Sequence, residues 1–136
     1  MEIIFRGAEA VIEKIIWQGF PAISKVRNKR SYRHPILEKR LVTERLRGES
    51  RVIERLLSGG VLVPALYEVN IHKSQIIMEF IEGITLERGL RTDKYHNYLV
   101  SSAELLSQIH SLGIVHGDPT TSNFMVSGEM YAIDFG

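Results

Sequence analysis

Residues 114–136 decide the fold, and they read IVHGDPTTSNFMVSGEMYAIDFG. Within this stretch, two short apolar runs, 124–126 and 131–133, flank the polar turn Ser-Gly-Glu-Met. Apolar runs joined by a short turn that contains glycine are typical of a β-hairpin. We therefore expect a hairpin whose two ends, at Asn123 and Asp134, emerge side by side.

Three oxygen-bearing side chains should gather at that end of the hairpin. Asp118 stands five positions before Asn123, and Asp134 follows eleven positions after it. Carboxylate and amide oxygens suit Mg²⁺, which keeps several waters and takes its remaining ligands from phosphates. Asn123 and Asp134 are therefore candidate Mg²⁺ ligands, and Asp118 would lie nearby, free to orient a hydroxyl or a water.

The chain before this stretch changes its pattern at Pro35. Upstream, apolar runs broken by glycines predict three strands, around 3–5, 10–17 and 22–27. Downstream, apolar residues recur at helical spacing, which predicts one long helix over 36–58 that a Gly-Gly pair ends. The apolar stripe of this helix consists of Leu37, Leu41, Val42, Leu46, Ile53 and Leu57.

Glu49 falls within that apolar stripe, seven positions after Val42 and four before Ile53. A carboxylate on a buried face needs a cation, because burying an unpaired charge is costly. Lys25 is a good candidate, since its strand should pack against this helix. The alternative is that Glu49 lies at the edge of the stripe and reaches solvent.

The second half of the chain predicts two more strands, around 65–70 and 75–79, and a helix over 94–112 that ends at Gly113. Three strands, a long helix, two strands, a helix and a hairpin indicate an α+β fold, with an antiparallel N-terminal sheet and a mainly helical second part. The apolar face of the second helix consists of Leu99, Ala103, Leu106 and Ile109.

The composition is that of a folded domain. The 136 residues include 17 Lys or Arg and 16 Asp or Glu, and 44% are apolar, which excludes a disordered polymer. The chain has no cysteine, which excludes disulfides and thiolate zinc sites. No apolar run reaches the roughly 18 residues of a membrane span, and the N-terminus does not resemble a signal peptide. We therefore expect a cytoplasmic protein with no membrane contact.

Charge is divided unevenly along the chain. Residues 1–58 hold 13 bases and 7 acids, a balance of +6, whereas residues 59–136 hold 4 bases and 9 acids, a balance of −5. A positive field of this kind favours phosphates, whether of a nucleotide or of nucleic acid. The alternative is a solvated helix face, because glutamates interleave with the bases over 39–55.

The motif His116-Gly-Asp118-x-x-x-x-Asn123, followed by Asp134-Phe-Gly, resembles the catalytic loop and metal-binding motif of protein kinases. The resemblance covers nearly the whole chain and implies a protein-kinase-like fold with ATP and Mg²⁺ as cofactors. It implies that Asp118 is a catalytic residue and that Asn123 and Asp134 bind the metal ion. An Arg usually precedes the catalytic Asp in kinases, but Gly117 stands here, so activation by loop phosphorylation is not expected.

The same resemblance implies a nucleotide site. Lys25 resembles the lysine that holds the nucleotide phosphates, and Glu49 resembles its partner on the helix, so both join the catalytic set. Met78 to Ile81 resemble the gatekeeper and hinge, where the Glu79 carbonyl and the Ile81 amide would hold the adenine. The nucleotide-binding residues that the resemblance implies are Gly7, Lys25, Met78, Glu79, Ile81, Met125 and Ile133.

Gly7 stands where kinases carry several glycines in a phosphate-binding loop. With a single glycine, backbone amides would approach the phosphates less closely, and side chains such as Arg6 or Lys14 could substitute for them. The alternative is that Gly7 is only the turn of a hairpin.

Three segments indicate one particular family among the kinase-like proteins. They are GAEA at 7–10, KRSYRHP at 29–35 and HGDPTTSN at 116–123. They are similar to the small atypical serine/threonine kinase or ATPase of the KEOPS complex, which also resembles RIO-type kinases and works in threonylcarbamoylation of adenosine in tRNA. By this resemblance, residues 1–80 form an N-lobe with the sheet and the long helix. Residues 81–136 form the hinge and part of a mainly helical C-lobe.

The resemblance also implies partners. They are the threonylcarbamoyl-transferring subunit and other KEOPS subunits, with tRNA contacted through the basic region 25–55. A kinase-like chain that stops at Gly136 lacks the activation segment and the later helices of the second lobe. We therefore expect this chain to be part of a longer protein.

Two other functions stay open at this point. A small-molecule kinase of the aminoglycoside phosphotransferase type shares His-Gly-Asp, but the Asp-Phe-Gly ending and the Tyr-Arg-His-Pro box argue against it. A nucleotide-binding scaffold for tRNA and partner proteins would bind RNA with an affinity that falls steeply with salt. That binding would persist after Asp118→Ala.

Overall fold

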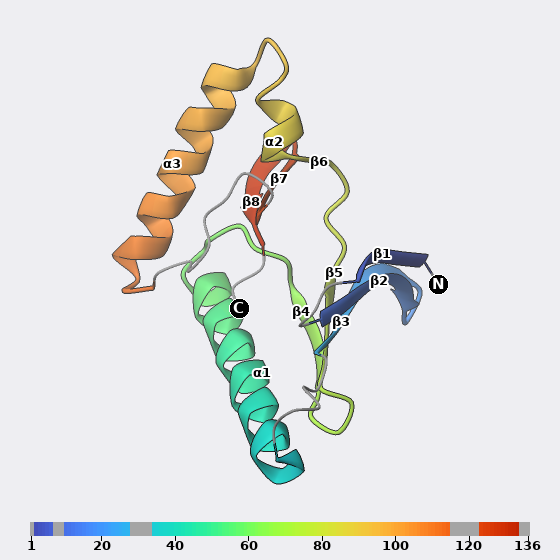
Figure 1. Ribbon diagram of the computed structural model, residues 1–136. Coiled ribbons are helices and arrows are strands. Elements are labelled where there is room, and N and C mark those ends of the chain that lie inside the picture. Colours follow the sequence, from blue (N-terminus) through green and yellow to red (C-terminus); the bar gives the residue numbers. More distant parts are fainter. Residues whose placement is uncertain (1, 7–9, 28–33, 115–122, 134–136) are drawn as a thin grey trace. The chain divides into compact units, whose positions relative to one another are not determined.

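The computed structural model describes residues 2–6, 10–27, 34–114 and 123–133. The described residues fold into an α+β arrangement of antiparallel strands and helices, which confirms the expected fold class (Figure 1). The strands are β1 (Glu2–Arg6), β2 (Ala10–Trp17), β3 (Phe20–Arg27), β4 (Leu66–Asn70), β5 (Gln75–Glu79), β6 (Ile84–Thr85), β7 (Phe124–Ser127) and β8 (Glu129–Ala132). The helices are α1 (Pro35–Ser58), α2 (Leu86–Gly89) and α3 (Tyr95–Ser111).

The chain divides into two compact units. The first consists of residues 1–51 and 65–80, and the second of residues 52–64 and 81–136. The first unit contains β1 to β5 and most of α1, while the last residues of α1 count with the second unit. No helix of the described residues is long and apolar enough to cross a membrane.

The first unit is built on a five-stranded antiparallel sheet in the order β1-β2-β3-β5-β4. The strand β3 begins at Phe20, earlier than the expected start at residue 22. Gln18 and Gly19 have φ values of +46° and +84°, and Trp17 pairs with Phe20 across them. Two residues with positive φ make a tight hairpin turn, so the residues after Gly19 pair at once.

The long helix is present as expected, and Val42, Leu46 and Ile53 of the expected stripe are buried, but the two ends of the stripe are not. Leu37 is 49% exposed and Leu57 is 38% exposed, so both were wrongly placed on the inner face. The buried positions recur with an average spacing close to 3.6, and they include the expected Glu49 and a second glutamate, Glu38, that was not expected there. These positions are Glu38, Val42, Leu46, Glu49, Ile53 and Leu56.

The end of α1 follows the expected Gly-Gly signal. Gly60 has φ +77° and donates its N–H to the Leu57 carbonyl, while Val61 donates to the Leu56 carbonyl. This pair of bonds is a Schellman cap, which satisfies carbonyls that the last turn leaves open. The helix therefore stops where a residue free to take positive φ is available.

The first unit contains two contacts that involve aromatic rings. Trp17 of β2 stacks on Tyr67 of β4, with ring centroids 4.8 Å apart and planes at 10°. The Lys14 ammonium lies 4.2 Å from the centroid of the Phe80 ring, a cation–π contact. Lys14 is one of the two side chains that could take the place of a glycine-rich loop at the phosphates. In the structure, its ammonium group contacts Phe80, the last residue of this unit.

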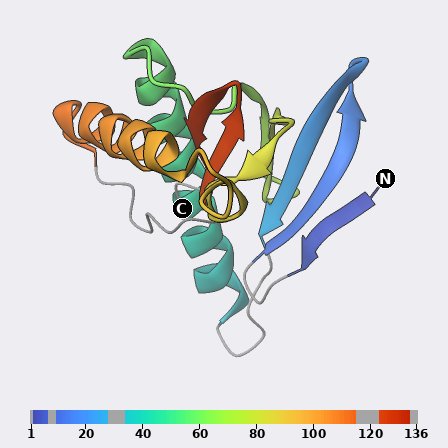
Figure 2. The same ribbon diagram turned by 90° about the horizontal axis from the view of Figure 1, so that it is seen from above.

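The second unit contains the expected hairpin. In Figure 2, β7 and β8 form the red hairpin beside the orange α3, and β6 pairs with β7 to make a three-stranded sheet. The strands are longer than expected, because Ser127 pairs directly with Glu129 and Gly128 alone turns the chain with φ +73°. The short β6 and α2 were not predicted.

The helix α3 ends before Gly113, as expected, but its buried face differs from the expected one. Ile109 is buried as expected, but Leu99 is 47% exposed, and Ser102 and Leu105 are buried instead. The Ser102 hydroxyl donates to the Leu99 carbonyl at 2.9 Å, so its burial leaves no polar group unpaired. A serine whose hydroxyl bonds within its own helix can be buried, although a search for apolar residues alone does not predict it there.

Gly83 marks a close backbone approach inside the second unit. A Cβ atom built on Gly83 would overlap the carbonyl oxygen of Val126 in β7. Only glycine leaves room for two backbone segments to meet in this way. The position before β6 therefore requires glycine, because any side chain there would overlap β7.

Candidate active site

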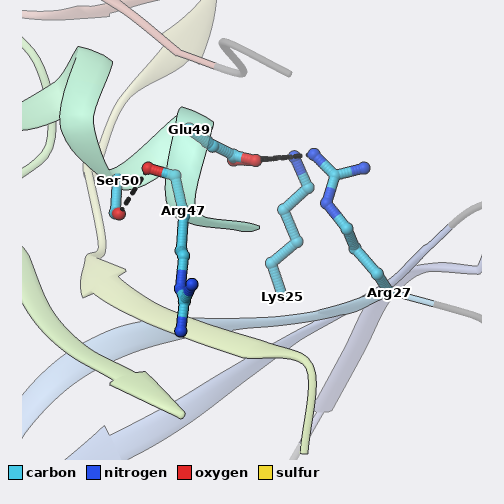
Figure 3. Close-up of polar contacts among 5 residues, drawn as sticks. All are labelled: Lys25, Arg27, Arg47, Glu49 and Ser50. Atoms are coloured by element: carbon cyan, nitrogen blue, oxygen red, sulfur yellow. Dashed lines mark hydrogen bonds and ion pairs between the residues drawn. The ribbon is translucent and has the colours of Figure 1, made fainter. Parts of the chain in front are cut away.

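The polar centre of the first unit joins β3 to α1. Lys25 and Arg27 lie two residues apart on β3, so they project from the same face of the sheet, and Glu49 reaches them from the helix (Figure 3). The Lys25 Nζ lies 3.0 Å from Glu49 Oε1 and 3.3 Å from Oε2. The Arg27 Nη2 lies 2.8 Å from Glu49 Oε2. We call these three residues the β3–α1 cluster.

All three members of the cluster are buried. The relative exposure is 8% for Lys25, 7% for Arg27 and 3% for Glu49. Removing charged groups from water costs several kcal/mol per ion and is tolerated only with close partners of opposite charge. The pairing of Lys25 with Glu49, which the helical spacing predicted, is thus confirmed, and the solvent-exposed alternative for Glu49 is excluded. The catalytic roles of both residues stay predictions.

Arg27 was missed by the sequence reasoning. The signal was present, since Arg27 stands two positions after Lys25 on one strand and therefore shares its face. It was counted only among the basic residues of the first half of the chain. Its Nε is buried and has no hydrogen-bond partner in the part of the chain that the structure describes.

Two of the expected nucleotide-binding residues belong to β5. Met78 pairs with Ile23 of β3, and Ile76 pairs with Lys25, so Met78 lies on the Lys25 face of the sheet. Glu79 pairs with Ala22 and lies on the opposite face. The placement of Met78 is compatible with a gatekeeper that faces the phosphate lysine.

Glu79 is held firmly at the end of β5. Its N–H donates to the Ala65 carbonyl at 2.8 Å, and its Oε1 accepts from the Ala65 N–H at 3.1 Å. Backbone and side chain of Glu79 thus bind the same residue. The carboxylate has a structural contact, and the expected adenine contact of Glu79 involves only its carbonyl.

The second unit carries the other expected residues. Ile133 donates its N–H to the Asn123 carbonyl at 2.9 Å, so the chain at Asn123 lies beside the chain at Ile133, the residue before Asp134. Met125 pairs with Tyr131, and Ile133 follows two residues later, so Met125 and Ile133 share the half-buried face of the hairpin. The hairpin's other face is closed by Phe124, which is 1% exposed. Ile81 is buried in the same unit.

Gly7, Asp118 and Asp134 lie outside the described residues. Within the ranges that are described, no three His, Asp or Glu side chains gather as a metal site would require. Asn123 is 8% exposed, and its backbone carbonyl accepts from Ile133, the residue that precedes Asp134 in the sequence. An amide oxygen and a carboxylate together are a donor set that Mg²⁺ accepts, and the metal-binding roles of Asn123 and Asp134 stay predictions.

Comparison with known proteins identifies the family. Residues 10–136 match the RIO domain. The chain belongs to the RIO domain family. Its kinase-like motifs and its residues of the β3–α1 cluster, all downstream of Ala10, lie within the matched range.

Relatives of this RIO domain carry the names that the resemblance implied. It is 39% identical over 132 residues to a "Probable bifunctional tRNA threonylcarbamoyladenosine biosynthesis protein" of Methanospirillum hungatei, covering 96% of this chain and 24% of the relative. It is 34% identical over 145 aligned positions to the "EKC/KEOPS complex subunit bud32" of Dictyostelium discoideum, covering 98% of this chain and 58% of the relative. The chain thus spans about a quarter of the first relative and somewhat more than half of the second.

A solved structure shares the fold of this RIO domain. The Rio2 kinase of Chaetomium thermophilum, crystallised as an ADP/Mg²⁺-phosphoaspartate complex, aligns with a TM-score of 0.74 over 99% of this chain and 48% of that one, at 16% identity. The expected protein-kinase-like fold is confirmed. At this identity the likeness concerns the fold, and the ligands belong to the Rio2 kinase.

Proposed function

We propose that this RIO domain binds ATP with Mg²⁺ and acts as an atypical serine/threonine kinase or ATPase. The observation that carries the proposal is the buried contact between Lys25 and Glu49, which brings a cation and a carboxylate from two elements to 3.0 Å. In kinases the lysine of this pair holds the nucleotide phosphates, and the glutamate pairs with that lysine. Membership of the RIO family supports the same reading.

The proposal gives each residue one role. Lys25 binds the α- and β-phosphates, and Glu49 orients Lys25. The Glu79 carbonyl and the Ile81 amide bind the adenine, and Asp118 orients the acceptor hydroxyl or water. Gly7 approaches the phosphates, and the apolar residues Met78, Met125 and Ile133 line the pocket that holds the adenine base.

Asn123 and Asp134 would hold Mg²⁺, which neutralises phosphate charge when bound. The acceptor oxygen forms a bond to the γ-phosphorus while the bond from that phosphorus to the bridging oxygen breaks, and ADP leaves. Asp118 takes the proton of the acceptor hydroxyl in the kinase reaction. Phosphoryl transfer needs mainly positioning and charge stabilisation, which buried polar residues supply.

The test is ATP binding and turnover by the parent and by Lys25→Met. Lys73→Met is the matched control, because Lys73 is an exposed lysine of the same unit. We expect Lys25→Met to lower turnover by about a hundredfold or more, and Lys73→Met to leave it unchanged. Equal turnover by both variants would contradict the proposal. Phosphoamino-acid analysis of casein detects the kinase reaction, and release of inorganic phosphate in the absence of casein detects the ATPase reaction.

The names of the relatives support a place in tRNA modification. We propose that this RIO domain works in the cytoplasm with the threonylcarbamoyl-transferring subunit and other KEOPS subunits. ATP turnover should rise when that subunit and tRNA are added together. Unchanged turnover after both additions would count against this partnership while leaving ATP binding intact.

A second function, RNA binding, is favoured by the outer face of α1. Arg40, Arg47 and Arg51 are exposed and stand at helical positions that share one face. Glu44 pairs with Arg40 there at 3.6 Å, but both side chains are largely exposed, and such pairs are weak. We propose that this face contributes to the tRNA contact expected for region 25–55.

Salt dependence tests the RNA contact. A triple variant with Arg40, Arg47 and Arg51 changed to Gln should reduce the slope of log affinity against log salt by about two to three, since each lost phosphate contact removes ~0.7–0.9. The control changes three exposed bases of the second unit to Gln and alters net charge equally. These control bases are Arg88, Arg91 and Lys94. Equal slopes for the two variants would exclude the α1 face.

A further inference from the structure

Arg27 contacts the carboxylate that orients Lys25, yet the proposed roles give Arg27 nothing to do. Its Nη2 lies 2.8 Å from Glu49 Oε2, the shortest contact in the β3–α1 cluster. Lys25 approaches both carboxylate oxygens, at 3.0 Å and 3.3 Å. Glu49 is therefore shared by two cations, and each cation contacts it separately.

The two cations differ in how they can move. The guanidinium is planar, always charged and limited to a fixed fork of donors, whereas the lysine ammonium is a point charge on a flexible stem. The Arg27 side chain is 6% exposed, and Figure 3 shows it pointing at Glu49 beside Lys25. Arg27 is thus suited to stay in place, while Lys25 can turn toward a new partner.

The surroundings of Arg27 tie it to Glu49. The buried Nε has no hydrogen-bond partner among the described residues, while Nη2 holds the Glu49 carboxylate. The Glu49 side chain is 1% exposed, so its carboxylate would strongly destabilise the folded protein if no cation were paired with it. Arg27 keeps Glu49 paired whatever Lys25 does.

We propose that Arg27 is a positioning residue that anchors Glu49 independently of Lys25. Lys25 can then give part of its hydrogen bonding to a nucleotide phosphate without leaving Glu49 unpaired. The inference rests on the proposed nucleotide binding by Lys25. It assigns Arg27 no contact with the nucleotide, so its whole effect on nucleotide affinity must pass through Lys25.

A double-mutant cycle tests this dependence, with the affinity for MgATP measured by calorimetry. Arg27→Gln should raise the Kd by about tenfold, a typical coupling between residues in contact. Arg27→Lys, which keeps the charge and loses the fork, should raise it by about threefold. In the Lys25→Met background, neither change should raise the Kd further. Arg88→Gln, an exposed arginine of α2, is the control and should leave the Kd unchanged.

The outcomes separate this inference from the proposed function. If Lys25→Met leaves the Kd for MgATP unchanged, the proposed function fails and the inference with it. If Lys25→Met raises the Kd but Arg27→Gln lowers only the melting temperature, Arg27 is merely structural and the inference alone fails. If the effect of Arg27→Gln persists in the Lys25→Met background, Arg27 acts on the nucleotide directly, which also overturns it. Should Arg27→Gln not fold, Arg27→Lys decides by the same comparisons.

Discussion

The β3–α1 cluster and the β7–β8 hairpin hold their polar residues in opposite ways. In the cluster, Glu49 lies 24 residues from Lys25 and 22 from Arg27, and side chains alone make the contacts. In the hairpin, the partners are near in sequence, and the backbone of Ile133 binds the backbone of Asn123. Charge holds the first site together, whereas backbone geometry holds the second.

Because of this difference, substitutions in the cluster and at the hairpin should differ in how strongly they affect stability and ATP turnover. In the cluster, the same three side chains that are proposed to bind or position the phosphate also form ion pairs in the buried interior, so removing one should lower both stability and ATP turnover. At the hairpin, the bond between Ile133 and Asn123 is made by the backbone, so replacing the proposed metal ligand Asp134 should affect the chemistry more than the fold. The substitutions below test this difference, in order of decreasing effect.

The largest effect is expected at the two aspartates that precede and follow the hairpin in the sequence. Asp134→Ala, or Asp118→Ala, should lower ATP turnover by about a thousandfold, because charge stabilisation at the phosphates is lost. The fold should survive, so the circular dichroism spectrum and melting temperature should stay close to those of the parent. Turnover at the parent rate in either variant would show that the assignment is wrong.

The next effect is expected at Glu49. Glu49→Ala takes away the carboxylate that Lys25 and Arg27 both contact, and it should destabilise the protein by about 3–5 kcal/mol. Urea denaturation measures the loss. Glu44→Ala, on the exposed side of the same helix, is the control and should change stability by no more than ~0.5 kcal/mol. Equal losses for the two variants would remove the basis of the contrast.

Gly83→Ala should have a smaller but clear effect. The added methyl group would overlap the Val126 carbonyl oxygen and force two backbone segments apart, at a cost of about 1–3 kcal/mol. Urea denaturation again measures it. A stability equal to the parent's would mean that backbone approach does not hold the second unit together.

The smallest effect is a gain. Gly48 lies inside α1, next to Glu49, and a Cβ atom there would meet nothing within 4 Å. Gly48→Ala should therefore stabilise the protein by about 0.5–1 kcal/mol, because alanine loses less conformational entropy in a helix. The melting temperature should rise, and a fall would reveal a need for glycine at this point of the helix.

The sequence predicted those parts of the fold and site that follow from local periodicity. The 3.6-residue repeat led to Glu49 on the inner face of α1, and its need for a cation led to Lys25. The alternation of apolar runs led to the hairpin and to Asn123 beside the strand end. In each case the physical rule acts on neighbouring residues or on a single face.

What was missed depended on contacts that polar residues make. Arg27 and Glu38 are buried, although a charged residue is expected to be exposed unless a specific partner is named. Ser102 took a core position in α3 because its hydroxyl bonds within the helix, and Leu99 was exposed instead. Turn chemistry at Gln18 and Gly19 extended β3. Pairing of this kind depends on three-dimensional packing, which spacing alone does not contain.

The stack of Trp17 on Tyr67 offers a spectroscopic separation of the two units. The chain has one tryptophan, and both stacked rings belong to the first unit. Tryptophan emission should therefore report the melting of the sheet that carries Lys25, while ellipticity follows the helices of both units. Two transitions at different temperatures would reveal that the units melt separately, and the emission curve would say which melts first.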